Sequence, residues 1–155
     1  MADMSIEIME YHPFDIKEIT ELFHNTVHTV NAKDYTEEQL AVWAKKEMDL
    51  EAWNASLLSH RSYVARTGES IVGFGDIDGT GYLDRLFVHK DYQRCGIGTL
   101  LCDKLESVSA TDKITVHASI TAKPFFEHRG YRTVRQQEVE RQGILLTNYI
   151  MEKDL

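Results

Sequence analysis

The sequence predicts one α+β domain over residues 1–155, with a mixed central sheet of about seven strands flanked by about four helices. Two observations carry this prediction. The length of 155 residues, of which 43% are hydrophobic, suits a single domain with a buried core. The apolar pattern switches between helical and strand periods in the order β, α, α, three β, α, β, α, two β. This order lacks the regular alternation of a doubly wound fold.

The first third of the chain is predicted to be helical after one short strand. Residues 6–8 alternate apolar and polar side chains, as a strand does. Apolar residues then recur at helical spacing over 16–30, and Asp15 with Glu18 fits a capping pair at the start of this helix. The same capping pattern at 36–39 precedes further helical spacing that includes both tryptophans.

The remaining two thirds are predicted to be strands interrupted by two helices. The expected elements are strands at 63–65, 71–77 and 82–88, a helix at 97–108, a strand at 114–116, a helix at 121–128 closed by Gly130, and strands at 131–140 and 144–151. Glycine-containing turns separate the first three of these strands. Three consecutive antiparallel strands are therefore the simplest arrangement.

Composition narrows the classes of partner. The net charge of −8 repels phosphate backbones, so we expect no nucleic acid. No run of about 18 apolar residues is present, and no basic segment followed by an apolar block marks a leader, so we expect no membrane association and a cytoplasmic location. Cys95 and Cys102 suit no disulfide framework, and with only His89 nearby they form no zinc pattern, so we expect no metal.

The segment 86–101 carries the chemical signal of the sequence. A strand there runs through a short loop into a helix that begins near Gly96 and Gly98. Backbone N–H groups at the start of a helix favour an anion, and glycines let a phosphate approach closely. The spacing lacks both the third glycine of the dinucleotide fingerprint and the Gly-Lys-Ser/Thr of a P-loop. The segment therefore predicts a phosphate site of another kind.

The run Gln-Arg-x-Gly-x-Gly at 93–98 resembles the pyrophosphate motif of the GNAT superfamily of N-acetyltransferases, which reads Gln/Arg-x-x-Gly-x-Gly/Ala. A second segment, 122–131, is similar to the family's helix beside coenzyme A, and the predicted order of elements fits the GNAT fold almost end to end. The resemblance implies an acetyl-CoA-dependent acyltransferase that acetylates an amine by direct attack in a ternary complex.

The resemblance also implies which residues hold acetyl-CoA. The backbone of 86–88 would contact the pantetheine arm, 93–99 would hold the pyrophosphate, and Arg94 would add a charge-assisted contact. The residues expected at the cofactor are Leu86, Phe87, Val88, Gln93, Arg94, Cys95, Gly96, Ile97, Gly98, Thr99, Ser119, Ala122, Phe125 and Phe126. Ser119 stands where the family often has an asparagine, so one contact to the coenzyme differs.

Acetylation of an amine needs a base for the amine and a proton for the departing thiolate. The family commonly uses a carboxylate on the fourth strand as base, which makes Asp84, on the same face as Val88, the first candidate. His117 is the second, because the ordinary pKa of histidine lies near working pH. The alternatives are that Asp84 pairs with Arg85 or Arg61 at the surface and that His117 is a buried, hydrogen-bonded histidine.

The usual proton donor of the family is missing. Many members place a tyrosine where this chain has Phe126. Tyr131 is the first candidate to take its role, and Tyr82, Tyr149 and Cys95 are the others. The remaining alternative is that solvent protonates the thiolate.

The family shapes its acceptor site between the first two helices and on the last strands. In this chain the corresponding residues are His28, Asn31, Tyr35, Trp43 and Tyr149. Aromatic rings with polar tips suit a small cationic or planar acceptor, so a small-molecule amine is the expected substrate. A protein or peptide acceptor, or a non-catalytic coenzyme A-binding module, is the alternative. Exposed edge strands also permit a homodimer.

Overall fold

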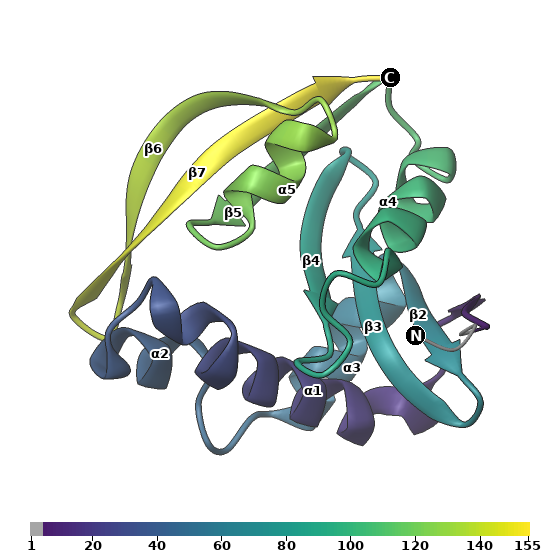
Figure 1. The fold of residues 1–155 in the computed structure, drawn as a ribbon, viewed down its shortest axis with the longest axis horizontal. Helices are drawn as coiled ribbons and strands as arrows, with labels where there is room; N and C mark the ends of the chain where they lie inside the picture. Colours follow the sequence, from purple (N-terminus) through teal and green to yellow (C-terminus); the bar gives the residue numbers. More distant parts are fainter. Residues whose placement is uncertain (1–4) are drawn as a thin grey trace.

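A seven-stranded sheet runs through the described residues, 5–155, of this computed structural model in the order β1-β2-β3-β4-β5-β7-β6 (Figure 1). The strands are β1 (Glu7–Glu10), β2 (Arg61–Thr67), β3 (Ser70–Ile77), β4 (Tyr82–Val88), β5 (Lys113–Ser119), β6 (Arg132–Arg141) and β7 (Ile144–Asp154). The helices are α1 (Ile16–Thr29), α2 (Glu37–Trp43), α3 (Leu50–Ser59), α4 (Ile97–Ser107) and α5 (Lys123–His128), with short 3-10 turns η1 (Pro13–Asp15) and η2 (Asn31–Lys33). The predicted α+β class is confirmed, with five α-helices among these residues instead of about four.

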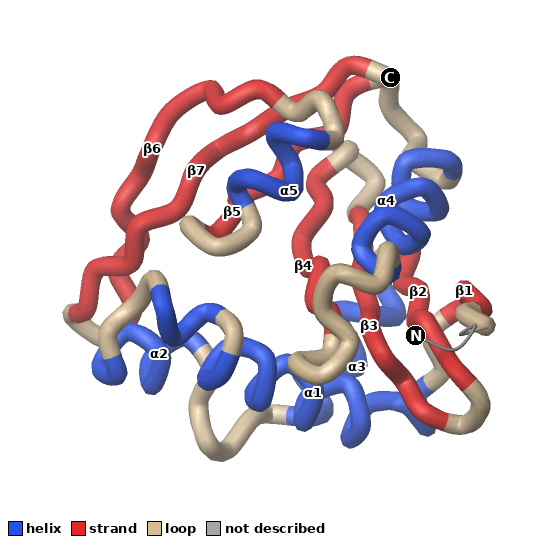
Figure 2. The backbone as a smooth tube through the Cα atoms, in the orientation of Figure 1, coloured by secondary structure: helices blue, strands red, loops and turns tan. Residues whose placement is uncertain are grey.

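The sheet divides between β4 and β5. These strands are parallel neighbours, but only Tyr82 with Thr115 and Leu83 with Val116 are in register. Beyond Leu83 the two strands diverge, as Figures 1 and 2 show. β5 instead continues in long antiparallel register with β7, from Lys113 to Ser119. The separation leaves the edge of β4 without a strand partner on that side, over residues 84–88.

Helices cover both faces of the sheet and form two apolar cores. Helix α4 buries Leu101 and Leu105 against one face. Helix α1 buries Ile19 and Val27 on the other face, where α2 and α3 also pack. The helical spacing of these residues explains why each helix presents one apolar side to the sheet. No helix in residues 5–155 is long and apolar enough to cross a bilayer.

The start of α1 differs from the predicted capping pair. Asp15 makes no side-chain cap for this helix; it accepts a hydrogen bond from the backbone N–H of His12 and pairs with Arg66 of β2. The Glu18 carboxylate accepts from the backbone N–H of Ile71 on β3. The prediction was wrong because both carboxylates have tertiary partners. The capping box at 36–39 is confirmed.

The segment after α1 bridges the divided sheet. The Tyr35 hydroxyl accepts from the backbone N–H of Ile120, at 2.9 Å, and donates to the carbonyl of Thr147 on β7, at 2.7 Å. The Gln39 side-chain amide donates to the carbonyl of Leu145 on the same strand, at 2.8 Å. These contacts join the N-terminal helices to the β6–β7 hairpin. They cross the space that the divergence of β4 and β5 opens.

We expect Tyr35→Phe to lower the free energy of unfolding by about 1–3 kcal/mol, because it leaves a partly buried donor and a partly buried acceptor without their shared partner. Urea denaturation measures the change. Tyr63→Phe is the matched control, because Tyr63 is similarly buried on β2 but its hydroxyl makes no hydrogen bond with the described residues. Equal, small losses in the two variants would contradict a bridging role for Tyr35.

Candidate active site

Two joined cavities occupy the divergence of β4 and β5. One has a volume of about 420 Å³ and lies between β4, β5 and the β6–β7 hairpin. The other, of about 350 Å³, lies between the end of α1, the loop after β4 and the start of α4. Both are lined by Leu86, Phe87, Ser119 and Ala122, so these residues form the junction. We call the larger one the acceptor cavity and the smaller one the cofactor cavity.

The start of α4 provides an anion site in the cofactor cavity. Gly96 is the N-cap residue in a left-handed conformation, with φ 82°, and no side chain caps the helix. The first backbone N–H groups of α4 are therefore left without side-chain acceptors at its positive end. A Cβ at Gly96 would have no atom within 4 Å, so the loop is open where a phosphate would approach.

Two residues of the motif serve the loop's own structure. The Gln93 side-chain amide donates to the carbonyl of Val88, at 2.7 Å, and more weakly to that of His89. It therefore holds the loop against the end of β4. A Cβ at Gly98 would lie 3.2 Å from the ring of Phe125, so this glycine lets α5 pack closely on α4. Gln93 and Gly98 thus fix the shape of the loop from two sides.

The cofactor cavity gathers most of the residues expected there. The expected residues that line it are Leu86, Phe87, Val88, Gln93, Arg94, Gly96, Ile97, Gly98, Thr99, Ser119, Ala122 and Phe125. Cys95 lies in the same loop but does not line the cavity, and Phe126 lines the acceptor cavity instead. The Val88 carbonyl also accepts from the Thr26 hydroxyl, at 3.1 Å. Because this carbonyl has two protein donors, Leu86 and Phe87 offer the open part of the strand edge.

Aromatic rings form one wall of the acceptor cavity. Phe23, Tyr35, Trp43 and Trp53 come from the N-terminal helices and the turn between them. The rings contact one another: the Tyr35 and Trp43 centroids are 5.2 Å apart, and those of Phe23 and Trp53 are 4.8 Å apart. Tyr35 and Trp43 therefore lie in the cavity where the acceptor was expected. Tyr35 and Trp43 thus both pack in the hydrophobic core and form part of the cavity wall.

Asp84 lies on a β-bulge. Asp76 is in register with Arg85 and Ile77 with Leu83, so Asp84 is an extra residue on β4. Its side chain is 31% exposed in the acceptor cavity, with a carboxylate oxygen 3.5 Å from Arg85 and 3.9 Å from His60. Val88, by contrast, packs against the core under α4. The expectation that Asp84 and Val88 share a face was wrong, because the bulge breaks the alternation.

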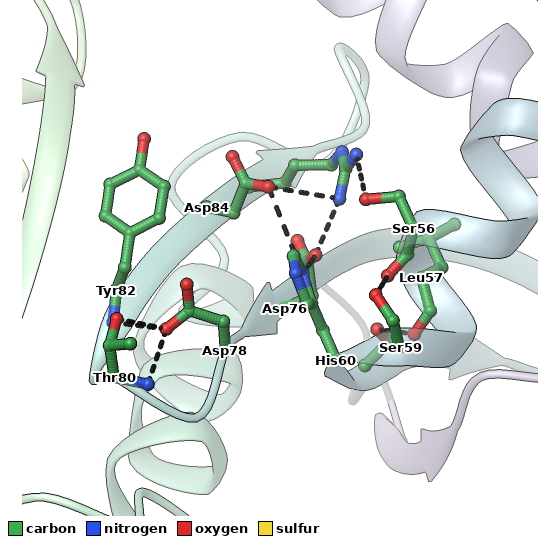
Figure 3. A network of polar contacts seen from close by, with 11 residues as sticks. Ser56, Leu57, Ser59, His60, Asp76, Asp78, Thr80, Tyr82 and Asp84 are labelled. Atoms are coloured by element: carbon green, nitrogen blue, oxygen red, sulfur yellow. Dashed lines mark hydrogen bonds and ion pairs between the residues drawn. The ribbon is translucent and has the colours of Figure 1, made fainter.

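A buried ion network supports Asp84 from behind (Figure 3). Asp76 is fully buried and accepts from Arg85 at 2.6 Å and from His60 at 2.7 Å. Arg85 also donates to the Ser56 hydroxyl at 2.9 Å and lies over the ring of Trp53, 4.8 Å from its centroid. Burial raises the pKa of Asp76, and the Arg85 guanidinium opposes that effect. Arg85, not Arg61, is thus the arginine beside Asp84.

The same network is the one group among residues 5–155 whose atoms could hold a metal ion. One ligand atom each of His60, Asp76 and Asp84 lies within 4.8 Å of the others. The Arg85 guanidinium already contacts both carboxylates and supplies the positive charge. A divalent cation would have to displace that charge. The expectation of no metal stays a prediction.

Two titratable side chains lie on the other side of Asp84. His117 is exposed in the acceptor cavity, not buried as its alternative interpretation supposed, and its ring packs edge-on against Tyr82 with centroids 5.0 Å apart. Partial burial lowers the pKa of His117, which Asp84 partly opposes, so its imidazole is neutral at pH 7. Burial, with the Asp84 charge, raises the pKa of Tyr82 to about 12 and keeps this phenol protonated.

Tyr131 and Tyr149 do not line either cavity. Tyr131 is buried in the core near α4, and its hydroxyl donates to Glu106 at 2.8 Å. Burial and this carboxylate raise the pKa of Tyr131 far above the ordinary range. The structure therefore places Tyr131 away from the reacting groups. Tyr149 lies under the ammonium group of Lys123, 5.0 Å from the ring centroid.

The remaining residues expected at the acceptor, Asn31 and His28, lie outside the acceptor cavity. Asn31 is buried and lines the cofactor cavity. His28 lines neither cavity; its ring nitrogen lies 2.7 Å from the carbonyl of Ala44, and its ring stacks on that of His24. Of the five expected acceptor residues, only Tyr35 and Trp43 line the acceptor cavity.

Sequence reasoning missed the residues that complete the acceptor cavity. Arg85, Trp53, Arg141 and Asn148 line it, and Asp76 lies behind it. One signal was available: Asp76 is a charged residue inside the apolar run of 71–77, where only a paired charge is expected. The others carry no local pattern that separates them from surface or core residues.

Comparison with known proteins agrees with this geometry. A family model described as an acetyltransferase (GNAT) domain matches residues 31–153. YafP of Escherichia coli K12, an uncharacterized N-acetyltransferase, is 36% identical over 148 residues, 95% of each chain. A GCN5-related N-acetyltransferase structure from Rhodopseudomonas palustris has a TM-score of 0.94 at 32% identity, covering 100% of this chain and 99% of that one. The Thermoplasma acidophilum PaiA N-acetyltransferase, in complex with coenzyme A, has a TM-score of 0.79 at 18% identity over 98% and 100% of the two chains.

The fold and the two joined cavities define an acyltransferase, in which a donor cavity opens onto an acceptor cavity. This chain belongs to the GNAT family of N-acetyltransferases. The predicted family, fold and enzyme class are therefore confirmed.

We expect Asp76→Asn to destabilise the protein by about 3 kcal/mol, because it removes the buried counter-charge of Arg85. Chemical denaturation measures the loss. Asp91→Asn is the control, because Asp91 pairs with Lys90 on the exposed surface, where such a pair contributes about 0–1 kcal/mol. A loss at Asp76 no larger than that at Asp91 would show that Arg85 needs no buried partner.

Proposed function

We propose that this N-acetyltransferase transfers the acetyl group of acetyl-CoA directly to a primary amine of a small molecule. The observation that carries the proposal is the acceptor cavity that meets the cofactor cavity at Leu86, Phe87, Ser119 and Ala122. Direct attack requires the two substrates to meet at such a junction. Residues suited to the cofactor line one side of this junction, and residues suited to the acceptor line the other.

The cofactor side fits a coenzyme A thioester. The open start of α4 and the left-handed Gly96 suit a pyrophosphate, and Arg94 lines the same cavity with a permanent positive charge. The edge of β4 at Leu86 and Phe87 offers backbone groups to an amide-containing arm. Bound there, acetyl-CoA would supply an activated carbonyl at the junction of the cavities.

The acceptor side favours a small molecule over a protein chain. Tyr35 and Gln39 are hydrogen-bonded to the β6–β7 hairpin and bridge the space that an extended peptide would have to cross. The volume of about 420 Å³ falls in the range of small-ligand sites. A protein acceptor would require these bridging contacts to break.

The acid and base roles follow from placement. Asp84 takes the proton of the acceptor's ammonium group, and the freed amine nitrogen bonds to the acetyl carbon as the carbon–sulfur bond breaks. As the amide forms, the nitrogen releases its second proton to water, which balances the proton that the thiolate receives. Tyr82 is the candidate acid for the departing thiolate, because among the phenols considered for this role it alone lines the acceptor cavity, and it stays protonated at neutral pH. His117 is the second candidate base.

We expect acetyl-CoA to bind with micromolar affinity and Gly96→Glu to abolish binding, because the new carboxylate adds bulk and negative charge at the phosphate site. Isothermal titration calorimetry measures both. Gly68→Glu is the matched control: Gly68 also has a positive φ, 59°, and open space around it, but it lies in the β2–β3 turn. No binding to the unaltered protein would overturn the proposed cofactor.

We expect Asp84→Asn to lower kcat by about 10²–10⁴-fold without weakening acetyl-CoA binding, because it removes the base alone. Release of coenzyme A thiol with an amine acceptor measures kcat, and calorimetry measures binding. His117→Gln should lower kcat by less than about tenfold. The reverse ranking of the two variants would assign the base to His117.

A further inference from the structure

The acceptor cavity carries opposite charges on facing walls. Three side chains of charged residues line it: Asp84 and Arg85 from β4, and Arg141 from the end of β6. In Figure 1, β4 and the β6–β7 hairpin face each other across the divided sheet. The distribution of these charges decides which acceptor the cavity can neutralise.

Arg85 adds no net charge to the cavity, because Asp76 cancels it. The guanidinium is 2.6 Å from the fully buried Asp76 carboxylate and is further held by the Ser56 hydroxyl at 2.9 Å. The side chain is only 16% exposed. Arg85 and Asp76 thus neutralise each other within the protein, where Asp76 Oδ1 accepts no hydrogen bond from the described residues, and Asp84 remains as the negative charge of this wall.

Arg141 is the positive charge of the opposite wall. It is exposed, and within residues 5–155 it makes no ion pair or side-chain hydrogen bond. Burial raises the pKa of Tyr82 to about 12, and the Arg141 charge acts in the opposite direction. The Arg141 side chain lines the same cavity as Asp84 and Tyr82. All five of its N–H donors are available to an acid group.

Aromatic side chains line the same cavity as these charges. The chain has two tryptophans, Trp43 and Trp53, and both line the acceptor cavity together with Phe23 and Phe87. Trp43 lies edge-on to Tyr35 and 6.4 Å from Phe87 between centroids. Such a wall favours a planar or bulky apolar group. The cavity therefore combines aromatic surface with charged side chains of both signs.

We propose that the acceptor is a zwitterion: an amino acid with an aromatic or bulky apolar side chain. Its amine contacts Asp84, its carboxylate contacts Arg141, and its side chain packs against Trp43 and Phe87. This assignment rests on the proposed function, because it places the acceptor's amine at the base. A simple amine would leave Arg141 without a partner, and an acid without an amine would leave Asp84 with only its contacts to Arg85 at 3.5 Å and His60 at 3.9 Å.

Tryptophan fluorescence tests the assignment without requiring turnover, because both tryptophans lie in the cavity wall. Phenylalanine is titrated against phenylalaninamide and phenethylamine, which keep the ring and the amine but lack the carboxylate. The variants are Arg141→Gln and the matched control Arg61→Gln, since Arg61 is an exposed arginine on β2 that lines neither cavity.

We expect phenylalanine to bind at least about tenfold more tightly than either analogue that lacks the carboxylate, the effect of one charge-assisted hydrogen bond. Arg141→Gln should remove that preference by weakening phenylalanine alone, while Arg61→Gln keeps it. Absence of a preference in the unaltered protein overturns the proposal. So does a loss at Arg141 that is equal for all three ligands, or no fluorescence response to any of them.

A parallel assay separates this proposal from the proposed function. The same ligands are offered with acetyl-CoA, and release of coenzyme A thiol is followed. Faster transfer to phenylalanine than to phenethylamine, abolished by Arg141→Gln, supports both proposals. Selective binding of phenylalanine without any transfer supports the ligand class but overturns amine acetylation. Transfer to phenethylamine in preference to phenylalanine supports acetylation and overturns the zwitterionic acceptor.

Discussion

The site depends on the loss of pairing between β4 and β5. Two residue pairs hold these parallel strands together at Tyr82 and Leu83, and beyond them each strand follows its own neighbours. An unpaired strand edge inside a sheet is unfavourable unless something else satisfies its backbone groups. The Thr26 and Gln93 side chains satisfy the Val88 carbonyl, and a bound thioester arm would serve the edge nearer the junction. The same divergence creates the space for both substrates.

The β-bulge at Asp84 and the buried Asp76 are linked features of this strand. The bulge turns Asp84 and Arg85 toward the α3 side, where Arg85 and His60 both contact Asp76. A fully buried carboxylate is costly without a partner, and the guanidinium at 2.6 Å compensates it. Asp84, the proposed base, thus stands beside an ion pair whose two charges already oppose each other.

Local patterns in the sequence predicted the helices, the strands and most of the cofactor cavity, because these features depend on residues that are close together in the sequence. The capping box at 36–39 and the loop at 93–98 are examples. The acceptor cavity was predicted less well, because it is assembled from segments far apart in the chain. The prediction that Asp84 and Val88 lie on the same face of β4 failed, because it assumed a regular strand without a bulge. The prediction that Tyr131 donates a proton in the site also failed. Its hydroxyl donates to Glu106 in the core, and no pattern in the sequence links these two residues.

The two cavities draw on different parts of the chain. The cofactor cavity is built largely from the continuous stretch between β4 and α5, whereas the acceptor cavity takes its variable walls from the N-terminal helices and the β6–β7 hairpin. Only the short junction belongs to both. Substitutions in α2, α3 or the hairpin can therefore alter acceptor preference while the donor site keeps its shape. In such an architecture, acceptor specificity can change through replacement of the α2–α3 helices or the β6–β7 hairpin, while the cofactor cavity stays the same.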